Sequence, residues 1–227
     1  KNVSTRLLGL TEQYKIQLPG RLNVYNALAV VATLRALGFQ QDQIQMDLLS
    51  YKGIKRRFEV VGVKNGITIV DDYAHHPTAV RETLNAARVR YFPVKDKGLG
   101  IKDNGRLWAI FEPHTFSRTK ATINDLAKAF DSADEVLISE IYPAREKISD
   151  TTISSKDVVN AIRLSPPLQG GVRRDKVEGG DGKNVRLVHD KTEALSIIKS
   201  ESQPDDVVIV MAVGDFNRLA YELKDKL

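Results

Sequence analysis

The sequence predicts an α/β protein with an open, mostly parallel, Rossmann-like sheet and helices on both faces. Short β-branched or apolar runs alternate with helical patterns from residue 58 to the end of the chain, as expected of βαβ units. The run Val207–Ala212 is continuously apolar, which is typical of a strand buried on both faces. An Asn-Gly pair at Asn65 and Gly66 predicts a hairpin turn between the first two strands.

The elements can be assigned in order from hydrophobic periodicity and from start and stop signals. Residues 1–18 have an extended pattern, and two helices are predicted at 23–37 and 42–50. Strands are predicted at 58–63, 67–70, 107–111, 135–139, 185–188 and 207–212. Helices are predicted between and after them at 77–89, 123–130, 155–162, 192–198 and 216–223. Residues 91–105 and 165–184 are rich in Gly, Pro, Lys and Asp, and we expect surface loops there, partly disordered.

The chain divides into two parts near residue 53. Residues 1–53 contain a short helical piece and are interpreted as the tail of a preceding domain with a linker, and residues 54–227 as the α/β domain. Because the sequence starts at Lys1 without Met, we expect a piece of a longer protein.

The composition excludes several classes of protein. The 227 residues are 42% hydrophobic and 28% charged, as in globular proteins. No apolar run is long enough to span a bilayer, so no membrane partner is expected. There is no cysteine, which excludes disulfides and thiolate chemistry and is compatible with a cytoplasmic location. The net charge of +5 suits an anionic partner, but no basic block with interleaved aromatics is present, so we expect no nucleic acid.

Candidate functional residues follow the predicted strands, where ligands bind in open α/β sheets. All four histidines lie just beyond a strand end. The candidate segments are 71–78, 112–119, 140–146 and 214–218. Plain structural alternatives remain: Asp71 and Asp72 as helix-start acids, His114 as a loop cap, and Arg118 as a solvated charge.

The familiar phosphate and nucleophile motifs are absent. The chain contains no G-x-x-x-x-G-K-[ST], G-x-G-x-x-G or G-x-S-x-G sequence. The residues alone therefore indicate only a sheet edge with acids, histidines and arginines, suited to a polar, anionic ligand.

Several ordered motifs resemble the Mur ligase family. Gly20–Ala29 is similar to the G-x-x-N-x-x-N-A-L-A segment that ends the central ATPase domain of that family, and Arg56–Glu59 resembles the motif that opens its C-terminal domain. Asp71–Thr78 resembles the signature of the muramate-binding members. Phe111–Thr119 and Glu140–Glu146 resemble motifs of the members that add L-alanine.

This resemblance implies the C-terminal domain of a three-domain ligase, with the N-terminal and central domains as partners. Its reaction would join L-alanine to UDP-N-acetylmuramate with ATP and Mg²⁺, the metal ligands lying mostly outside this chain. By position in the motifs, Arg57 resembles the catalytic arginine at the phosphates, Asp72 the acid at the ATP ribose, and Asn23 and Asn26 further ATP contacts. The pocket for the amino acid would contain four residues of the motifs: Tyr73, His75, His114 and Arg118.

Three positions depart from the family pattern. Leu22 replaces a histidine, Arg145 a glycine, and Ala79 a glutamate. Ala79 is more frequent in the related ligase that recycles a murein tripeptide, so that activity is the first alternative. A non-catalytic nucleotide- or RNA-binding α/β module is the second.

Overall fold

The computed structural model describes residues 2–7, 10–93, 105–147, 153–165 and 184–227. The chain forms two compact units, Lys1–Ile54 and Lys55–Leu227, which are described separately. Most of the two predicted loops, at residues 94–104 and 166–183, lies outside the described residues.

The first unit combines a hairpin with two helices. Strands β1 (Asn2–Leu7) and β2 (Leu10–Lys15) pair antiparallel, and helices α1 (Arg21–Ala36) and α2 (Gln41–Ser50) follow. The extended pattern of residues 1–18 therefore corresponds to a paired hairpin, and the unit is more than a helical piece. Its small core consists of buried side chains from β2, the residue after it and both helices: Tyr14, Ile16, Ala27, Val31 and Ile44.

The second unit contains the predicted α/β sheet. Its six strands lie in the order β3-β4-β8-β5-β6-β7, and only β3 runs antiparallel to its neighbour. The strands are β3 (Glu59–Lys64), β4 (Ile67–Asp72), β5 (Leu107–Phe111), β6 (Glu135–Ile138), β7 (Asn184–Leu187) and β8 (Val207–Met211). The central strands β5 and β8 are wholly buried, as their apolar sequences predicted. The predicted fold class is confirmed.

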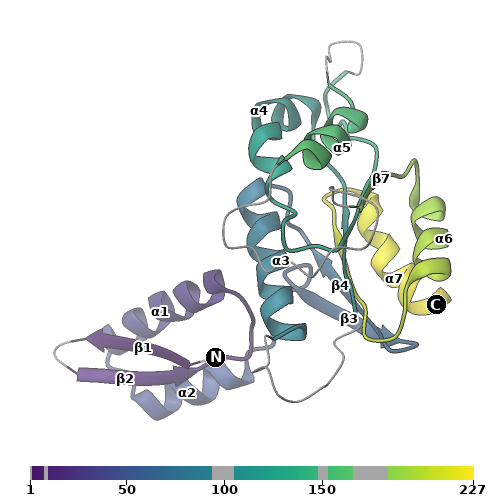
Figure 1. Cartoon of the computed structure of the whole chain (residues 1–227). Coiled ribbons are helices and arrows are strands. Elements are labelled where there is room, and N and C mark those ends of the chain that lie inside the picture. The colour runs from purple at the N-terminus through teal and green to yellow at the C-terminus, as the bar shows by residue number, and fades with distance from the viewer. Residues whose placement is uncertain (1, 8–9, 94–104, 148–152, 166–183) are drawn as a thin grey trace. The chain divides into compact units, whose positions relative to one another are not determined.

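Helices cover both faces of this sheet (Figure 1). On one face lie α3 (Pro77–Tyr91), α4 (Phe116–Ala127) and α5 (Ser155–Leu164), whose apolar side chains share a core with alternate residues of the strands. On the other lie α6 (Lys191–Glu201) and α7 (Arg218–Lys226), the latter preceded by a short 3₁₀ turn. Among the described residues, no helix is long and apolar enough to cross a membrane.

Helix α4 differs most from the prediction. It begins at Phe116 rather than at residue 123, so Arg118 lies in the first helical turn and not in a loop. The start was missed because the N-cap residue, Thr115, makes no capping hydrogen bond and the first turn contains no acidic residue, which are the usual signals.

Candidate active site

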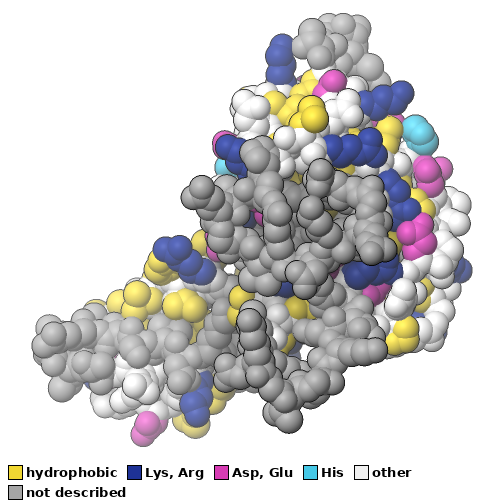
Figure 2. All heavy atoms as spheres, viewed as in Figure 1, with side chains coloured by type: hydrophobic (Ala, Val, Ile, Leu, Met, Phe, Trp, Pro, Cys, Tyr) yellow, Lys and Arg dark blue, Asp and Glu magenta, His cyan; other side chains and the backbone are white. Residues whose placement is uncertain are grey.

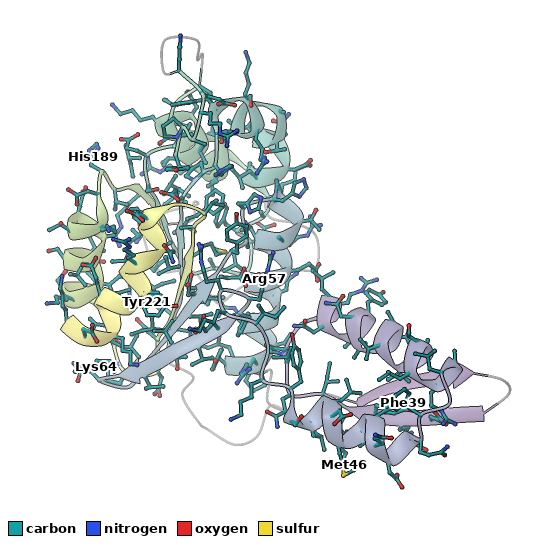
Figure 3. All side chains as sticks on the ribbon, turned by 180° about the vertical axis from the view of Figure 1, so that it is seen from behind. Phe39, Met46, Arg57, Lys64, His189 and Tyr221 are labelled. Carbon is teal, nitrogen blue, oxygen red and sulfur yellow. The ribbon has the colours of Figure 1, made fainter. Side chains whose placement is uncertain are left out.

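The carboxyl ends of β4, β8, β5 and β6 lie side by side, which brings the four predicted segments together. Backbone hydrogen bonds continue between these segments beyond the strands. The Glu112 N–H donates to the Met211 carbonyl (3.0 Å), and the Ser139 N–H to the Phe111 carbonyl (3.0 Å). The edge is therefore a continuous, ordered surface. Figure 3 shows that His189, which follows β7, lies well apart from Lys64, at the β3–β4 hairpin.

Four rings from three of these segments form one group, here called the aromatic cluster: Tyr73, His75, His114 and Tyr142. The ring centroids of Tyr73 and His75 are 5.2 Å apart, and those of His75 and His114 are 5.7 Å apart. Tyr142 stacks on His114 at 5.7 Å. The structure thus brings together three residues that the sequence had assigned to one pocket. It adds Tyr142, for which no role had been predicted.

Arg118 contacts this cluster through His114. Its Nη1 lies 3.3 Å from His114 Nδ1, an i, i+4 pair across the start of α4. Burial, and then the positive charges of Arg118 and His75, lower the pKa of His114. A neutral imidazole can accept from the guanidinium at Nδ1. Within the described part of the chain, no carboxylate lies at ion-pair distance from Arg118, which leaves its other donors for a ligand.

Two consecutive arginines flank the ring of Tyr73 but are used differently. Arg56 is partly buried; its Nη2 donates to the Ala212 carbonyl (2.7 Å) and its Nε lies 3.7 Å from the Asp71 carboxylate. Arg57 is exposed, with its guanidinium 5.2 Å from the Tyr73 ring centroid (Figure 3). Arg56 therefore ties the loop to β8, and Arg57 is the one that presents a charge to solvent.

The Asp72 carboxylate is buried and surrounded by donors of its own unit. Oδ1 accepts from the Ala74 N–H (2.7 Å), and Oδ2 accepts from the Phe58 N–H (2.8 Å) and the Thr83 hydroxyl (3.3 Å). Burial raises the pKa of Asp72, although all three hydrogen bonds oppose the shift. Asp72 thus orders the residues after Arg57 and after Tyr73. Its contact with a ribose remains a prediction.

The asparagines assigned to the nucleotide lie in the first unit. Asn23 Nδ2 donates to the Pro19 carbonyl (2.6 Å) before α1, and Asn26 is exposed on that helix. Their roles as ATP contacts remain predictions.

Glu112 and Gly214 join the segments that follow β5 and β8, a contact that was not predicted. Glu112 is buried, and its Oε2 accepts from the Gly214 N–H (2.9 Å). Burial raises the pKa of Glu112, against the hydrogen bonds from Gly214 and Val213. A Cβ added at Gly214 would lie 3.0 Å from the Tyr142 ring and 3.2 Å from Glu112 Oε2. Both residues lie in segments that the strand-end rule had selected, but nothing in the sequence showed that they meet.

The described residues contain no group of three or more His, Asp or Glu side chains that could hold a metal ion.

Residues 56–214 match the family described as Mur ligase, glutamate ligase domain. The chain belongs to the Mur ligase family. It is 39% identical over 214 residues to the UDP-N-acetylmuramate–L-alanine ligase of Caldanaerobacter subterraneus subsp. tengcongensis, a match that covers 94% of this chain. It is 36% identical to the enzyme of the same name from Acetivibrio thermocellus, over 93% of this chain. In both cases the chain spans 39% of the relative's length.

Solved Mur ligase structures have the same fold. The UDP-N-acetylmuramate–alanine ligase MurC of Thermotoga maritima aligns with a TM-score of 0.70 at 24% identity, covering 95% of this chain and 40% of that one. A murein peptide ligase from Psychrobacter arcticus aligns with a TM-score of 0.56 at 24% identity, covering 95% and 38%. The family resemblance inferred from the motifs is confirmed.

Proposed function

We propose that this chain is the C-terminal part of an ATP-dependent ligase that joins L-alanine to UDP-N-acetylmuramate in peptidoglycan precursor synthesis. The observation that carries the proposal is the Arg118 guanidinium, held by His114 at the sheet's carboxyl edge with no carboxylate partner among the described residues. The names of the curated relatives agree with it.

In this proposal the aromatic cluster and Arg118 receive the amino acid. A guanidinium binds a carboxylate with two parallel hydrogen bonds, so Arg118 would bind the carboxylate of L-alanine. His114 is kept neutral by its lowered pKa and therefore adds no competing charge. Tyr73 and His75 would line the pocket for the small side chain of L-alanine.

In the second unit, Arg57 and Asp72 would contact ATP; Asn23 and Asn26 of the first unit are proposed as ATP contacts from the motif alone. ATP supplies the phosphoryl group that activates the muramyl carboxylate. The exposed guanidinium of Arg57 lies 5.2 Å from the Tyr73 ring centroid, where it would stabilise negative charge on the transferring group. The ligands of Mg²⁺ would lie mostly outside this chain.

The first unit supports the assignment of residues 1–53 to the tail of a central ATPase domain. Among the side chains of this unit that the structure describes, nine large apolar ones are exposed: Leu22, Tyr25, Val30, Leu37, Phe39, Met46, Leu49, Tyr51 and Ile54. Hydrophobic atoms are visible on its surface in Figure 2, and Phe39 and Met46 are labelled in Figure 3. So much exposed apolar surface on a small unit indicates a face that other residues cover. We expect the N-terminal and central domains as partners, in a cytoplasmic enzyme.

The test is turnover by the full-length enzyme. With ATP, Mg²⁺ and UDP-N-acetylmuramate, we expect phosphate release that depends on L-alanine and a product of the mass of the amide. This chain alone, which has no P-loop sequence, should release no phosphate above a mock preparation. Preferred use of the murein tripeptide would favour the recycling activity instead. Nucleotide binding without turnover by the full-length protein would favour the non-catalytic module.

The structure gives a packing reason for Ala79, the residue that suggested the tripeptide as the alternative substrate. Ala79 lies in the first turn of α3 and packs against the hydrophobic core. Its small side chain is therefore accounted for without reference to the acceptor, and L-alanine remains the proposed substrate.

A further inference from the structure

We propose that Glu146 is a positioning residue that fixes Arg118 and His114 for the carboxylate of the amino acid; this inference rests on the proposed function. The hydrogen bonds of the Glu146 carboxylate go to Phe116 and Ser117, not to any of the four rings of the aromatic cluster. It acts through the start of helix α4.

Helix α4 has no cap of its own. Thr115, its N-cap residue, has a φ of 60° and makes no side-chain capping bond. Glu146, from the segment after β6, takes that place: its Oε2 accepts from the N–H groups of Phe116 (2.6 Å) and Ser117 (3.0 Å). Its Oε1 accepts from the Ser117 hydroxyl. By contrast, α5 and α6 are capped by their own N-cap residues, Ser154 and Asp190.

A carboxylate at this position also decides where a second carboxylate can bind. The first N–H groups of a helix attract anions, and the two that Glu146 binds in α4 lie one and two residues before Arg118. The hydrogen bonds from Ser117 lower the pKa of Glu146, so that it is charged at neutral pH. Because Glu146 fills the helix end, a substrate carboxylate is directed to the Arg118 side chain and not to the backbone.

Backbone hydrogen bonds make the link between the two segments rigid. The Tyr142 N–H donates to the Pro113 carbonyl (2.8 Å), and the Thr115 N–H donates to the Tyr142 carbonyl (2.8 Å). His114 and Tyr142 thus pair as a short parallel bridge, on which their rings stack. Glu146 adds hydrogen bonds from the segment after β6 to the first turn of α4. Removing it frees the first turn of α4, which carries Arg118, while His114 stays bridged, so the 3.3 Å contact between them is lost.

The kinetic test uses the full-length enzyme with Glu146→Ala, Glu146→Gln and a matched control, Asp190→Ala, which removes the cap of α6. We expect Glu146→Ala to raise the KM for L-alanine about tenfold or more, since small misplacements of a binding group have effects of that size. The KM for ATP should stay within about twofold. Glutamine keeps an oxygen for the two N–H groups, so Glu146→Gln should recover most of the loss. Asp190→Ala should leave the KM for L-alanine unchanged.

A pH profile separates positioning from general destabilisation. The charge of Glu146 raises the pKa of His114, so its neutralisation in Glu146→Gln should lower that pKa further. The acid limb of kcat/KM for L-alanine should then move to lower pH. An unchanged acid limb, a wild-type KM in Glu146→Ala, or an equal rise in the KM for ATP would overturn the inference.

An NMR experiment on this chain decides the matter independently of the substrate. Glu146→Ala should speed amide hydrogen exchange at Phe116 and Ser117 and shift the Arg118 Nε and His114 ring signals, whereas Asp190→Ala should not. If the wild-type enzyme does not use L-alanine, the proposed function fails while these signals still test the role of Glu146. Unchanged signals in Glu146→Ala would refute the positioning role even in an active ligase.

Discussion

Asp72→Asn distinguishes two roles for a carboxylate that the sequence assigned to the ATP ribose. In the structure both oxygens already accept from donors on Phe58, Ala74 and Thr83. Asparagine has almost the same shape, so the substitution leaves no cavity. It replaces one acceptor by an NH₂ group, which cannot accept from an N–H donor.

The expected magnitude follows from these contacts. With the amide oxygen retained towards the Ala74 N–H, the NH₂ group faces the Phe58 N–H, and the Thr83 hydroxyl can turn to accept from it. One buried N–H then remains unpaired, at a cost of about 1–3 kcal/mol. Burial raises the pKa of Asp72, which shows that the charge itself is costly here, and the neutral side chain recovers part of that cost. We expect a net loss of about 1–2 kcal/mol in the free energy of unfolding.

Two measurements decide between the roles. Denaturant unfolding of this chain near neutral pH should show the loss in Asp72→Asn but not in Asp225→Asn, an exposed control near the C-terminus. In the full-length enzyme the KM values for ATP and L-alanine should rise together, because Asp72 orders the residues next to both Arg57 and Tyr73. A rise in the KM for ATP alone, with unchanged stability, would refute the ordering role and leave the proposed ribose contact as the only role of Asp72.

Three further predictions concern single residues. Arg118→Lys in the full-length enzyme should raise the KM for L-alanine about 10- to 100-fold, because lysine cannot form the paired hydrogen bonds. The KM for ATP should stay nearly the same. Wild-type kinetics would show that Arg118 does not bind the carboxylate and is only a surface charge. Gly214→Ala should raise the KM for L-alanine, because its Cβ would lie 3.0 Å from the Tyr142 ring; an unchanged KM would mean that the ring moves freely. Burial raises the pKa of Asp71 to about 6 from 3.8, so its contribution to folding stability is lost as pH rises between these values. Asp71→Asn should therefore gain about 2 kcal/mol relative to wild type between about pH 4.5 and 8 in unfolding experiments, and a pH-independent difference would contradict the shift.

Most of the fold could be predicted because its strands are short, apolar and locally distinct. The strand Leu107–Phe111 was predicted at its observed bounds, and the Asn-Gly turn correctly marked the β3–β4 hairpin. The start of α4 was wrong because its cap, Glu146, lies in another segment. A cap supplied from a distant part of the chain leaves no pattern within a local window.

The candidate site was predictable in its location but not in its internal contacts. The rule that ligands bind at the carboxyl ends of strands selected the segments containing His75, His114 and Arg118, and the structure brings them together. It did not indicate that Arg56 points inward to the Ala212 carbonyl while Arg57 stays exposed. That difference depends on β8, whose neighbours in the sheet cannot be deduced from the order of the strands along the chain.

Strand β8 is the element that assembles the site. β4 and β5 carry His75 and His114 at their ends, yet they do not pair with each other; each pairs with β8 between them. The residues after β8 then accept from Arg56 and donate to Glu112, which ties the two flanking segments to the same loop. Since Gly214 in this loop has no side chain, Tyr142 can approach closely and stack on His114. The aromatic cluster therefore depends on a strand that follows both histidines in sequence, and it can form only after residues 207–214 have joined the sheet.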